Sequence, residues 1–397
     1  MKSEWKIRTV GELTSYISKG IPPKYTDKKT NSTIVVLNQK CNRDYKISYE
    51  QSRLHDTTKK AVPTDKMLQY GDVLINSTGT GTAGRIAQFF NNDISTTVDG
   101  HMIIMRASKE IDYLYYGYAL KSYQKKIESF AEGSTGQTEI NKQRLQEELL
   151  IKYPQNIDLQ RSIALILKNI DDKIELNTAI NENLHQLIAA YYAEIFGNCE
   201  FSATISDYAD KVFSGGTPTT SNESYWNGEF KWLSSGETSQ KYIVDTEKTI
   251  TQQGVENSST RLASKYDTVI ASAGQGHTRG QTSMLLTDTY VNQSIIVVNS
   301  DNVLKPFIYW NLCGRYEELR VISNSNSIRG SLTTKMISSF SAPKADLTLI
   351  NKFSELAWAA ILEIEKNCNE ITRLTALRDT LLPKLMNGEI DVSAVKI

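Results

Sequence analysis

The sequence predicts an α+β protein in which two mixed α/β modules alternate with two long helices packed as an antiparallel coiled coil. Three observations support this fold class. The chain repeats itself, each repeat holds short apolar runs between Gly-, Ser- and Thr-rich stretches, and each repeat ends in a long segment with apolar residues at helical spacing. A chain of 397 residues also exceeds one compact core, so several domains are expected.

The repeat consists of three blocks that occur in the same order in both halves of the chain. Their offsets are 195, 195 and 193 residues, so we predict a tandem duplication of a unit of about 190 residues. The aligned pairs are VGELTSYISKGIPP (10–23) with ISDYADKVFSGGTP (205–218), DVLINSTGTG (72–81) with DTVIASAGQG (267–276), and VDGHMII (98–104) with VNQSIIV (291–297).

Prolines mark the predicted ends of the two modules, because a residue that precedes proline disfavours helix. Pro154 lies in KYPQNIDLQ and Pro343 lies in SAPKADLTL, each just before a long helical pattern. The predicted domains are the first module (1–154), the first spacer helix (155–198), the second module (199–345), the second spacer helix (346–390) and a C-terminal tail (391–397).

The two predicted helices carry apolar residues at a 4-3 spacing, which is the pattern of a coiled-coil seam with central Asn residues that fix register. The alternative is a core helix that packs on its own domain. The first seam runs over 33 residues, roughly 50 Å at ~1.5 Å per residue, which is more than one small domain buries, so we expect the helices to pack on each other. The seam residues are Ile163, Leu167, Ile170, Ile174, Asn177, Asn181, Leu184, Ile188, Tyr191 and Ile195 in the first helix, and Ile350, Phe353, Ala357, Ala360, Ile364, Asn367, Ile371 and Leu374 in the second.

Charge is balanced over the chain, with 45 Lys and Arg against 45 Asp and Glu, but it is distributed unevenly. Residues 1–154 hold 23 basic and 17 acidic side chains, a difference of +6, whereas residues 158–196 hold 3 and 6, a difference of −3. A basic module before an acidic segment allows a polyanion on one and a protein partner on the other, although charge alone slightly favours ordinary solvated surfaces.

The chain shows no apolar leader and no apolar run long enough to cross a membrane. Its four cysteines are scattered, without a C-x-x-C pair. We therefore expect a reduced, cytoplasmic protein without a disulfide framework or structural zinc.

The stretch GTGTAG (79–84) follows an apolar strand-like run and matches the G-x-G-x-x-G dinucleotide fingerprint. The second repeat reads GQGHTRG (274–280), so the third glycine is displaced, and RIAQFF after the first stretch is typical of a strand, whereas the fingerprint must open a helix. We therefore predict a tight turn between two strands, in which the glycines adopt positive φ.

Local motifs of catalysis are absent. The sequence has no G-x-x-x-x-G-K-[ST], no H-E-x-x-H and no G-x-S-x-G, and its four histidines lie far apart without metal-ligand spacing. This favours binding over catalysis, and we expect no catalytic residue, no metal and no cofactor on this chain.

Two stretches carry a family resemblance. KVFSGGTPTTSNESYWNGEFKWLSSGE (211–237) resembles the opening of a target-recognition domain in the specificity subunit of type I restriction-modification systems. ALRDTLLPKLMNGEI (376–390) resembles the end of the second conserved helix of those subunits, and the order of domain, helix, domain and helix is also similar. The resemblance covers essentially the whole chain.

This resemblance implies a DNA-reading scaffold that is itself not an enzyme. Each mixed α/β target-recognition domain would read one half of a split, asymmetric site in double-stranded DNA. The paired helices would set the spacing and dock two methyltransferase (modification) subunits, and endonuclease/translocase subunits would join this core. S-adenosylmethionine, ATP and Mg would then belong to those partner subunits.

The expected DNA contacts lie in the repeated blocks, since Gln and Arg can read base edges and Lys can contact phosphates. Core packing is the alternative for Tyr225 and Trp226 and the preferred one for Trp232, and KGIPPKY departs from the GGTPTTS pattern at residues 20–23. The candidates are Lys19, Gly20, Lys24, Ser77, Thr78, Thr80 and Arg85 in the first unit, and Ser214, Gly215, Gly216, Thr217, Tyr225, Trp226, Gln275, His277 and Arg279 in the second.

Three other functions stay open from the sequence. The chain could serve a methyltransferase that lacks a translocating nuclease, or it could be a scaffold whose two modules bind ligands other than nucleic acid. Neutral net charge is the best argument for the scaffold. A dinucleotide enzyme is the weakest alternative.

Overall fold

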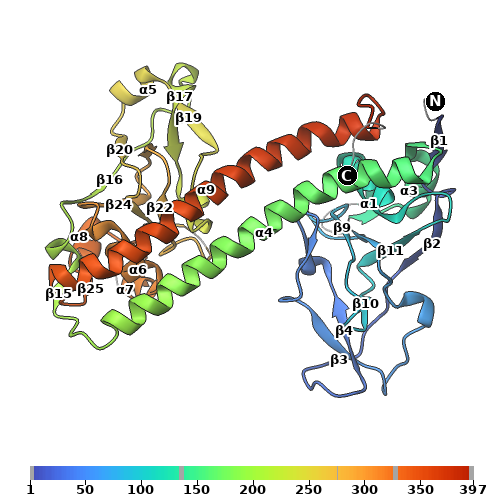
Figure 1. The fold of residues 1–397 in the computed structure, drawn as a ribbon, viewed down its shortest axis with the longest axis horizontal. Helices are drawn as coiled ribbons and strands as arrows, with labels where there is room; N and C mark the ends of the chain where they lie inside the picture. Colours follow the sequence, from blue (N-terminus) through green and yellow to red (C-terminus); the bar gives the residue numbers. More distant parts are fainter. Residues whose placement is uncertain (1–3, 134–137, 275, 325–329, 393–397) are drawn as a thin grey trace. The chain divides into compact units, whose positions relative to one another are not determined.

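The computed structural model describes residues 4–133, 138–274, 276–324 and 330–392 (Figure 1). The chain divides into two compact units, Met1–Asp172 with Leu374–Ile397, and Lys173–Arg373. Two long helices, α4 (Ile157–Phe196) and α9 (Leu347–Met386), each contribute one part to either unit. No helix in the described ranges is long and apolar enough to cross a membrane.

The first unit contains a central antiparallel sheet with strand order β2-β11-β8-β9 and a small sheet with order β10-β4-β7-β3, in which β10 and β4 run parallel. β1 pairs with β14 beside them. The elements are β1 (Trp5–Thr9), β2 (Thr14–Lys19), β3 (Tyr25–Thr26), β4 (Thr33–Leu37), β5 (Asn42–Arg43), β6 (Lys46–Ile47), β7 (Arg53–Asp56), β8 (Val73–Asn76), β9 (Ile86–Gln88), β10 (Thr96–Val98), β11 (Met102–Ala107), α1 (Tyr113–Ser122), α2 (Gln124–Glu128), β12 (Ala131–Glu132), β13 (Glu139–Ile140), α3 (Lys142–Glu148) and β14 (Leu150–Pro154).

Both faces of the central sheet are covered, which explains why its strands are continuously apolar rather than alternating. In β8, Val73 and Ile75 pack into the core that includes α1 and the start of α4, whereas Leu74 packs on the other side with Leu37 and Phe89. The sheet is therefore the middle layer between helices and the small sheet.

The second unit repeats this plan. Its central sheet has the order β16-β24-β21-β22-β18, and its small sheet has the order β19-β17-β23-β20. The elements are β15 (Ala203–Thr204), β16 (Lys211–Ser214), β17 (Trp226–Leu233), β18 (Tyr242–Ile243), β19 (Lys248–Ile250), α5 (Gln252–Glu256), β20 (Arg261–Ala263), β21 (Thr268–Ala271), β22 (Thr282–Leu285), β23 (Thr289–Val291), β24 (Ile295–Asn299), α6 (Leu304–Cys313), α7 (Tyr316–Asn324), α8 (Thr334–Ser338) and β25 (Ser341–Ala342).

Backbone hydrogen bonds show that the duplication extends to the details of the fold. The Ser77 N–H donates to the carbonyl of His101 (2.8 Å), and the Ser272 N–H donates to that of Ser294 (2.8 Å). In the first unit the Ile140 N–H donates to the Ser77 carbonyl. In the second unit the Leu332 N–H donates to the Ser272 carbonyl in the same way. The predicted order of two mixed α/β modules and two long helices is therefore confirmed.

In the second unit the helices run antiparallel, since Asn177 of α4 contacts Glu370 of α9, whereas the later Asn181 contacts the earlier Asn367. In the first unit Asp171 pairs with Arg378 (2.9 Å). In the second unit the Asn367 amide donates to the Asn181 side-chain oxygen (2.9 Å), so Asn residues of the two predicted seams meet. Every predicted seam side chain is buried or half-buried.

Two details of the fold add to the sequence pattern. The segment 113–130, whose residues suit a helix, forms two helices, α1 and α2, which are separated at Tyr123. The displaced third glycine is structurally retained, because the N–H groups of Gly84 and Gly280 make the same hydrogen bond, to Asn76 and Ala271 respectively. The second turn is simply one residue longer.

Candidate nucleic-acid interface

The glycine-rich turn of the first unit joins β8 to β9 and takes its shape from backbone conformation. Gly79, Gly81 and Gly84 have φ of 107°, 71° and 87°, values that side-chain-bearing residues rarely adopt. The Thr82 and Ala83 N–H groups donate to the Gly79 carbonyl. A strand follows this turn directly, so no helix N-terminus is available to hold a pyrophosphate.

The second unit builds the same turn between β21 and β22. Gly274, Gly276 and Gly280 have φ of 139°, 64° and 87°. Between the glycines, Thr80 is exposed in the first turn and His277 is exposed in the second. The two turns therefore share three positive-φ glycines but present different side chains, and Gln275 is the residue at the position of Thr80. Gln275, which was also expected at this site, lies outside the described residues.

Three candidates of the first unit meet around β13. The Lys19 ammonium pairs with the Glu139 carboxylate, and Thr78 forms a bridge with the same strand. The Thr78 hydroxyl also lies 2.9 Å from Nδ1 of His101. Ser77 is fully buried, so its side chain packs inside the unit and is not presented on the surface of the turn.

The glycines before the small sheets have a structural reason to be glycine. A Cβ on Gly20 would lie 2.1 Å from the Val98 carbonyl oxygen, and one on Gly215 would lie 1.9 Å from that of Val291. A Cβ on Gly216 would lie 2.0 Å from the Oγ of Ser259. These glycines are therefore required by the close approach of the chain itself, through Val98, Val291 and Ser259 respectively.

The two arginines of the turns are held by the protein itself. Arg85 donates to the Gly81 carbonyl (3.0 Å) within its own turn. Arg279 is half-buried and donates to the Gly330 carbonyl and to the Asn324 side chain. Both therefore brace their turns in this conformation, and a base contact by Arg279 would need these bonds to open.

The remaining candidates of the second unit lie where β16 ends and β17 begins. Trp226 packs edge-on against Trp232 at 5.0 Å, and Trp232 is 4% exposed with its indole N–H directed to the Gly216 carbonyl. The preferred core role of Trp232 is confirmed. The Thr217 hydroxyl donates to Gln293, while Ser214 and Tyr225 are half-buried.

Comparison with known proteins gives this duplicated arrangement a family. Residues 2–186 match the model of the type I restriction modification DNA specificity domain. The type I restriction enzyme MjaIX specificity subunit of Methanocaldococcus jannaschii is 22% identical over 413 residues, which cover 98% of this chain and 94% of that protein. Over residues 2–186 the chain therefore carries the DNA specificity domain, and over its whole length it is similar to type I restriction-modification specificity subunits. The predicted resemblance is thus confirmed.

The fold agrees with a solved structure of this family. The type I restriction-modification S subunit from M. genitalium superposes with a TM-score of 0.62 at 19% identity, over 97% of this chain and 96% of the other. The tandem domain and helix architecture of this chain is therefore that of a known structure.

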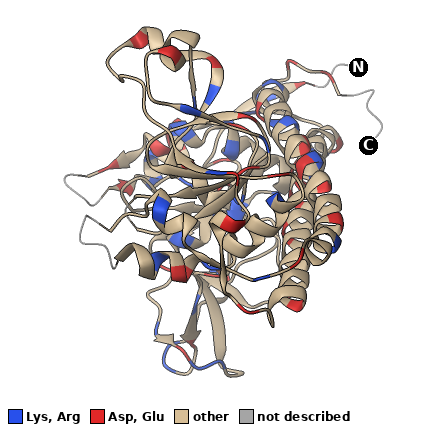
Figure 2. Cartoon of the chain, turned by 90° about the vertical axis from the view of Figure 1, so that its left-hand side faces the viewer, with Lys and Arg blue, Asp and Glu red and all other residues tan. Residues whose placement is uncertain are grey.

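The small sheet of the first unit carries a cluster of cations that the motif search missed. The segment 24–60 of this chain holds 9 Lys and Arg against 4 Asp and Glu, a difference of +5. In Figure 2, basic residues colour the lowest loops of the view, at the β3 end seen in Figure 1. We call Lys24, Lys28, Lys29 and Lys60, all exposed, the lysine edge. A local charge count would have found it.

The small sheet of the second unit is different in charge. The segment 219–260, which ends just before β20, holds 3 Lys against 6 Glu and Asp, a difference of −3. Two of these lysines are neutralised, Lys231 by Asp245 and Lys241 by Glu182. Between these two segments, free positive charge therefore concentrates on segment 24–60.

Two buried acidic groups complete the electrostatics of the first unit. Burial raises the pKa of Asp99, whose carboxylate accepts the His101 N–H (2.9 Å) and so shapes the loop before β11. Burial also acts to raise the pKa of Asp171, but Lys121 and Arg378 outweigh it and hold this pKa below its usual value. Both groups stabilise the fold, and Asp99 does so next to the turn, because His101 also contacts Thr78.

Proposed function

We propose that this chain reads a split, asymmetric site in double-stranded DNA, with one half-site for each unit. The observation that carries the proposal is the pair of matched turns, which keep three positive-φ glycines each but present Thr80 in one and His277 in the other. Two copies of one frame with different exposed side chains suit two half-sites of different sequence.

The lysine edge supports the DNA part of the proposal. Exposed lysines without carboxylate partners can neutralise phosphates and release counterions, which supplies affinity without sequence preference. This argument favours DNA over the alternative of a scaffold for ligands other than nucleic acid, because that scaffold has no use for the excess charge.

The long helices would dock the two methyltransferase subunits, which endonuclease/translocase subunits would join. Both helices expose leucines beyond their buried seam, and such side chains suit a protein partner. They are Leu176 (55% exposed) and Leu187 (57%) on α4, and Leu362 (55%) and Leu377 (46%) on α9. S-adenosylmethionine, ATP and Mg would be bound by those partners. A complex without the nuclease is the second candidate, and the helix surface fits both.

The experiment is to coexpress this chain with its candidate methyltransferase subunit and map methylated adenines across host DNA. We expect one split, asymmetric motif with a fixed gap, present only with this chain. Methylation that does not depend on the chain, or a stable complex that methylates nothing, would remove the proposal and leave the scaffold in first place.

Matched variants test the assignment of half-sites. Thr80→Ala should change the base preference in one half of the motif only, and His277→Ala in the other half only, because each exposed side chain belongs to one turn. Lys352→Gln, an exposed position on α9, should change neither half. A variant that alters both halves equally would contradict one half-site per unit.

A further inference from the structure

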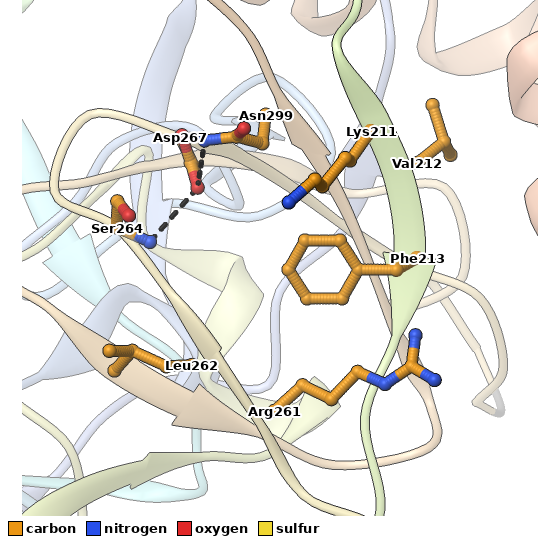
Figure 3. A pocket seen from close by; sticks show the side chains of 8 residues that line it. All are labelled: Lys211, Val212, Phe213, Arg261, Leu262, Ser264, Asp267 and Asn299. Carbon is orange, nitrogen blue, oxygen red and sulfur yellow. Dashed lines mark hydrogen bonds between the residues drawn. The ribbon is translucent and has the colours of Figure 1, made fainter.

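The second unit contains an open pocket of about 520 Å³ between β16 and β20, the edge strands of its two sheets. Figure 3 shows the Phe213 ring directed into it, between the side chains of Lys211 and Arg261. The Arg261 guanidinium carbon lies 6.0 Å from the centre of this ring. Leu262 and Val212 add apolar surface to the wall.

The two cations of the pocket are available to a ligand. Lys211 and Arg261 are exposed, and in the described part of the chain neither side chain makes an ion pair or a hydrogen bond. The one acid in the wall, Asp267, is already neutralised, since the Lys305 ammonium lies 2.7 Å from its carboxylate and the Asn299 amide donates to it. The pocket therefore holds uncompensated positive charge.

The first unit closes the same place with its own side chains. Strand register places Tyr16 opposite Arg106, as it places Lys211 opposite Asn299. The Tyr16 hydroxyl donates to Asp65 (2.9 Å), and the Arg106 guanidinium lies 5.1 Å from the Tyr16 ring. Lys66, the counterpart of Arg261, donates to the Gly20 carbonyl (3.0 Å). Each polar group there has a partner within the fold.

One exchange of residues explains why the second unit is open. In the first unit Arg106 neutralises the buried Asp72 with two hydrogen bonds of 2.8 Å. In the second unit the shorter Asn299 occupies that position, and Lys305 reaches Asp267 from α6. The space of a guanidinium is thus left beside β16, and Phe213 stands where the first unit has Ser18.

We propose that this pocket binds a nucleoside phosphate, with the phosphate between Lys211 and Arg261 and the base on the Phe213 ring. Arg and Lys recognise phosphate through charge-assisted hydrogen bonds, and aromatic side chains stack on any nucleobase. Inorganic phosphate would satisfy the cations but leave Phe213 and Leu262 uncovered. The nucleotide can come from solution or from a DNA strand, and the chemistry of the pocket is the same for both.

The first experiment titrates the whole chain with each of the four deoxynucleoside 5′-monophosphates by calorimetry, with inorganic phosphate as reference. We expect the monophosphates to bind at least about tenfold more tightly than inorganic phosphate. The double variant Lys211→Gln with Arg261→Gln should lose at least about tenfold in nucleotide affinity. Lys352→Gln, which removes an exposed charge elsewhere in the unit, should lose nothing. Equal nucleotide binding by the double variant would overturn the proposal.

A second variant separates the base contact from charge. Phe213→Ser copies the residue of the first unit and should reduce the nucleotide affinity to that of inorganic phosphate, while the affinity for inorganic phosphate stays unchanged. The retained phosphate binding also shows that this variant is folded. If Phe213→Ser kept the preference for nucleotide, the base would not lie on this ring and the proposal would fail.

The last experiment identifies the source of the nucleotide. Duplex DNA with 2-aminopurine in the half-site should gain fluorescence with the natural chain and not with Phe213→Ser, if the pocket takes a base from DNA. If neither the natural chain nor Phe213→Ser increases the fluorescence, but the natural chain binds monophosphates, the pocket takes free nucleotides. The free-nucleotide measurement does not rest on the proposed DNA function, so that function and this pocket can fail separately. No monophosphate binding and no fluorescence gain would overturn the pocket.

Discussion

The two units neutralise the same buried carboxylate in different ways. Asp72 is neutralised by the Arg106 guanidinium, which donates two hydrogen bonds to it from the strand beside it. Asp267 is served by Asn299 on the equivalent strand and by Lys305 on α6. A buried charge must be paired, but the partner can move to another element of the fold. This exchange leaves a pocket beside β16 in the second unit, whereas side chains of the first unit pair with one another at the equivalent place.

Charge on the small sheets separates the units further. The segment 24–60 has a charge of +5 and segment 219–260 has a charge of −3. A shared backbone therefore does not imply a shared mode of binding: the first unit has the charge for phosphate contacts, and the second has the pocket.

The largest expected effect concerns the buried ion pairs. Arg106→Met should cost about 3–5 kcal/mol of stability, because it leaves Asp72 buried without a cation. Asn299→Ala should cost only about 1 kcal/mol, since Lys305 still neutralises Asp267. Hydrogen–deuterium exchange of β11 measures the stability of the first unit, and that of β24 measures the stability of the second. Similar losses of stability for both variants would show that Lys305 does not neutralise Asp267 in the way that Arg106 neutralises Asp72.

The next expected effect is a loss of stability of the second unit at acidic pH. His185 lies among Tyr242, Tyr309 and Trp310, and burial together with Lys241 lowers its pKa from 6.5 to about 4. The unfolded chain then binds the proton more tightly, so the stability is complete above pH 6.5 and is lost as pH falls towards 4. The shift corresponds to roughly 3 kcal/mol.

Tryptophan fluorescence follows this loss, since four of the five tryptophans, all but Trp5, lie in the second unit. His185→Leu should flatten the dependence of the unfolding midpoint on pH between 6.5 and 4. His277→Gln, at an exposed site, should retain it. An unchanged pH profile in His185→Leu would assign the acid sensitivity to other groups.

Salt dependence tests the contrast between the small sheets. Replacing the four lysines of the lysine edge with Gln should lower the slope of log affinity against log salt by about 3.6, at about 0.9 for each phosphate contact. Between 100 and 400 mM salt, the natural chain should lose about a hundredfold more affinity for its DNA site than the variant.

The matched variant replaces Lys231, Lys241 and Lys248 of the second unit with Gln. Its slope should change much less, because Lys231 and Lys241 are already paired with carboxylates. Equal changes in both variants would contradict the assignment of phosphate contacts to the first unit.

The smallest effect concerns the helix pair in the second unit. Asn367→Ala removes the donor to Asn181 in a buried seam and should cost about 1–2 kcal/mol. Asn369→Ala, an exposed Asn of the same helix, should cost less than about 0.5 kcal/mol. Chemical unfolding followed by tryptophan fluorescence compares the two. Equal costs would show that the Asn pair contributes nothing specific.

Local and periodic features were predictable from the sequence. The helices could be placed because apolar residues recur at 4-3 spacing, and the turns could be placed because glycines follow apolar runs. The transfer of the ion pair from Arg106 to Lys305 could not, since α6 and β21 meet only in the folded unit. Nor could the closed surroundings of Gly20, because Val98 lies far away in the chain and reaches it through the parallel bridge between Ile21 and Asp99. Long-range pairing sets these features.

The glycines of the turns bear on how such a subunit can change its target. Because positive φ at Gly79, Gly81 and Gly84 fixes the path of the first turn, the exposed residues between them carry little of the folding energy. Thr80 can therefore be exchanged by single point mutations without an intermediate that fails to fold. The same holds for His277 in the second turn. Each turn can drift independently, so one unit can change the side chains that it presents while the other unit keeps its own.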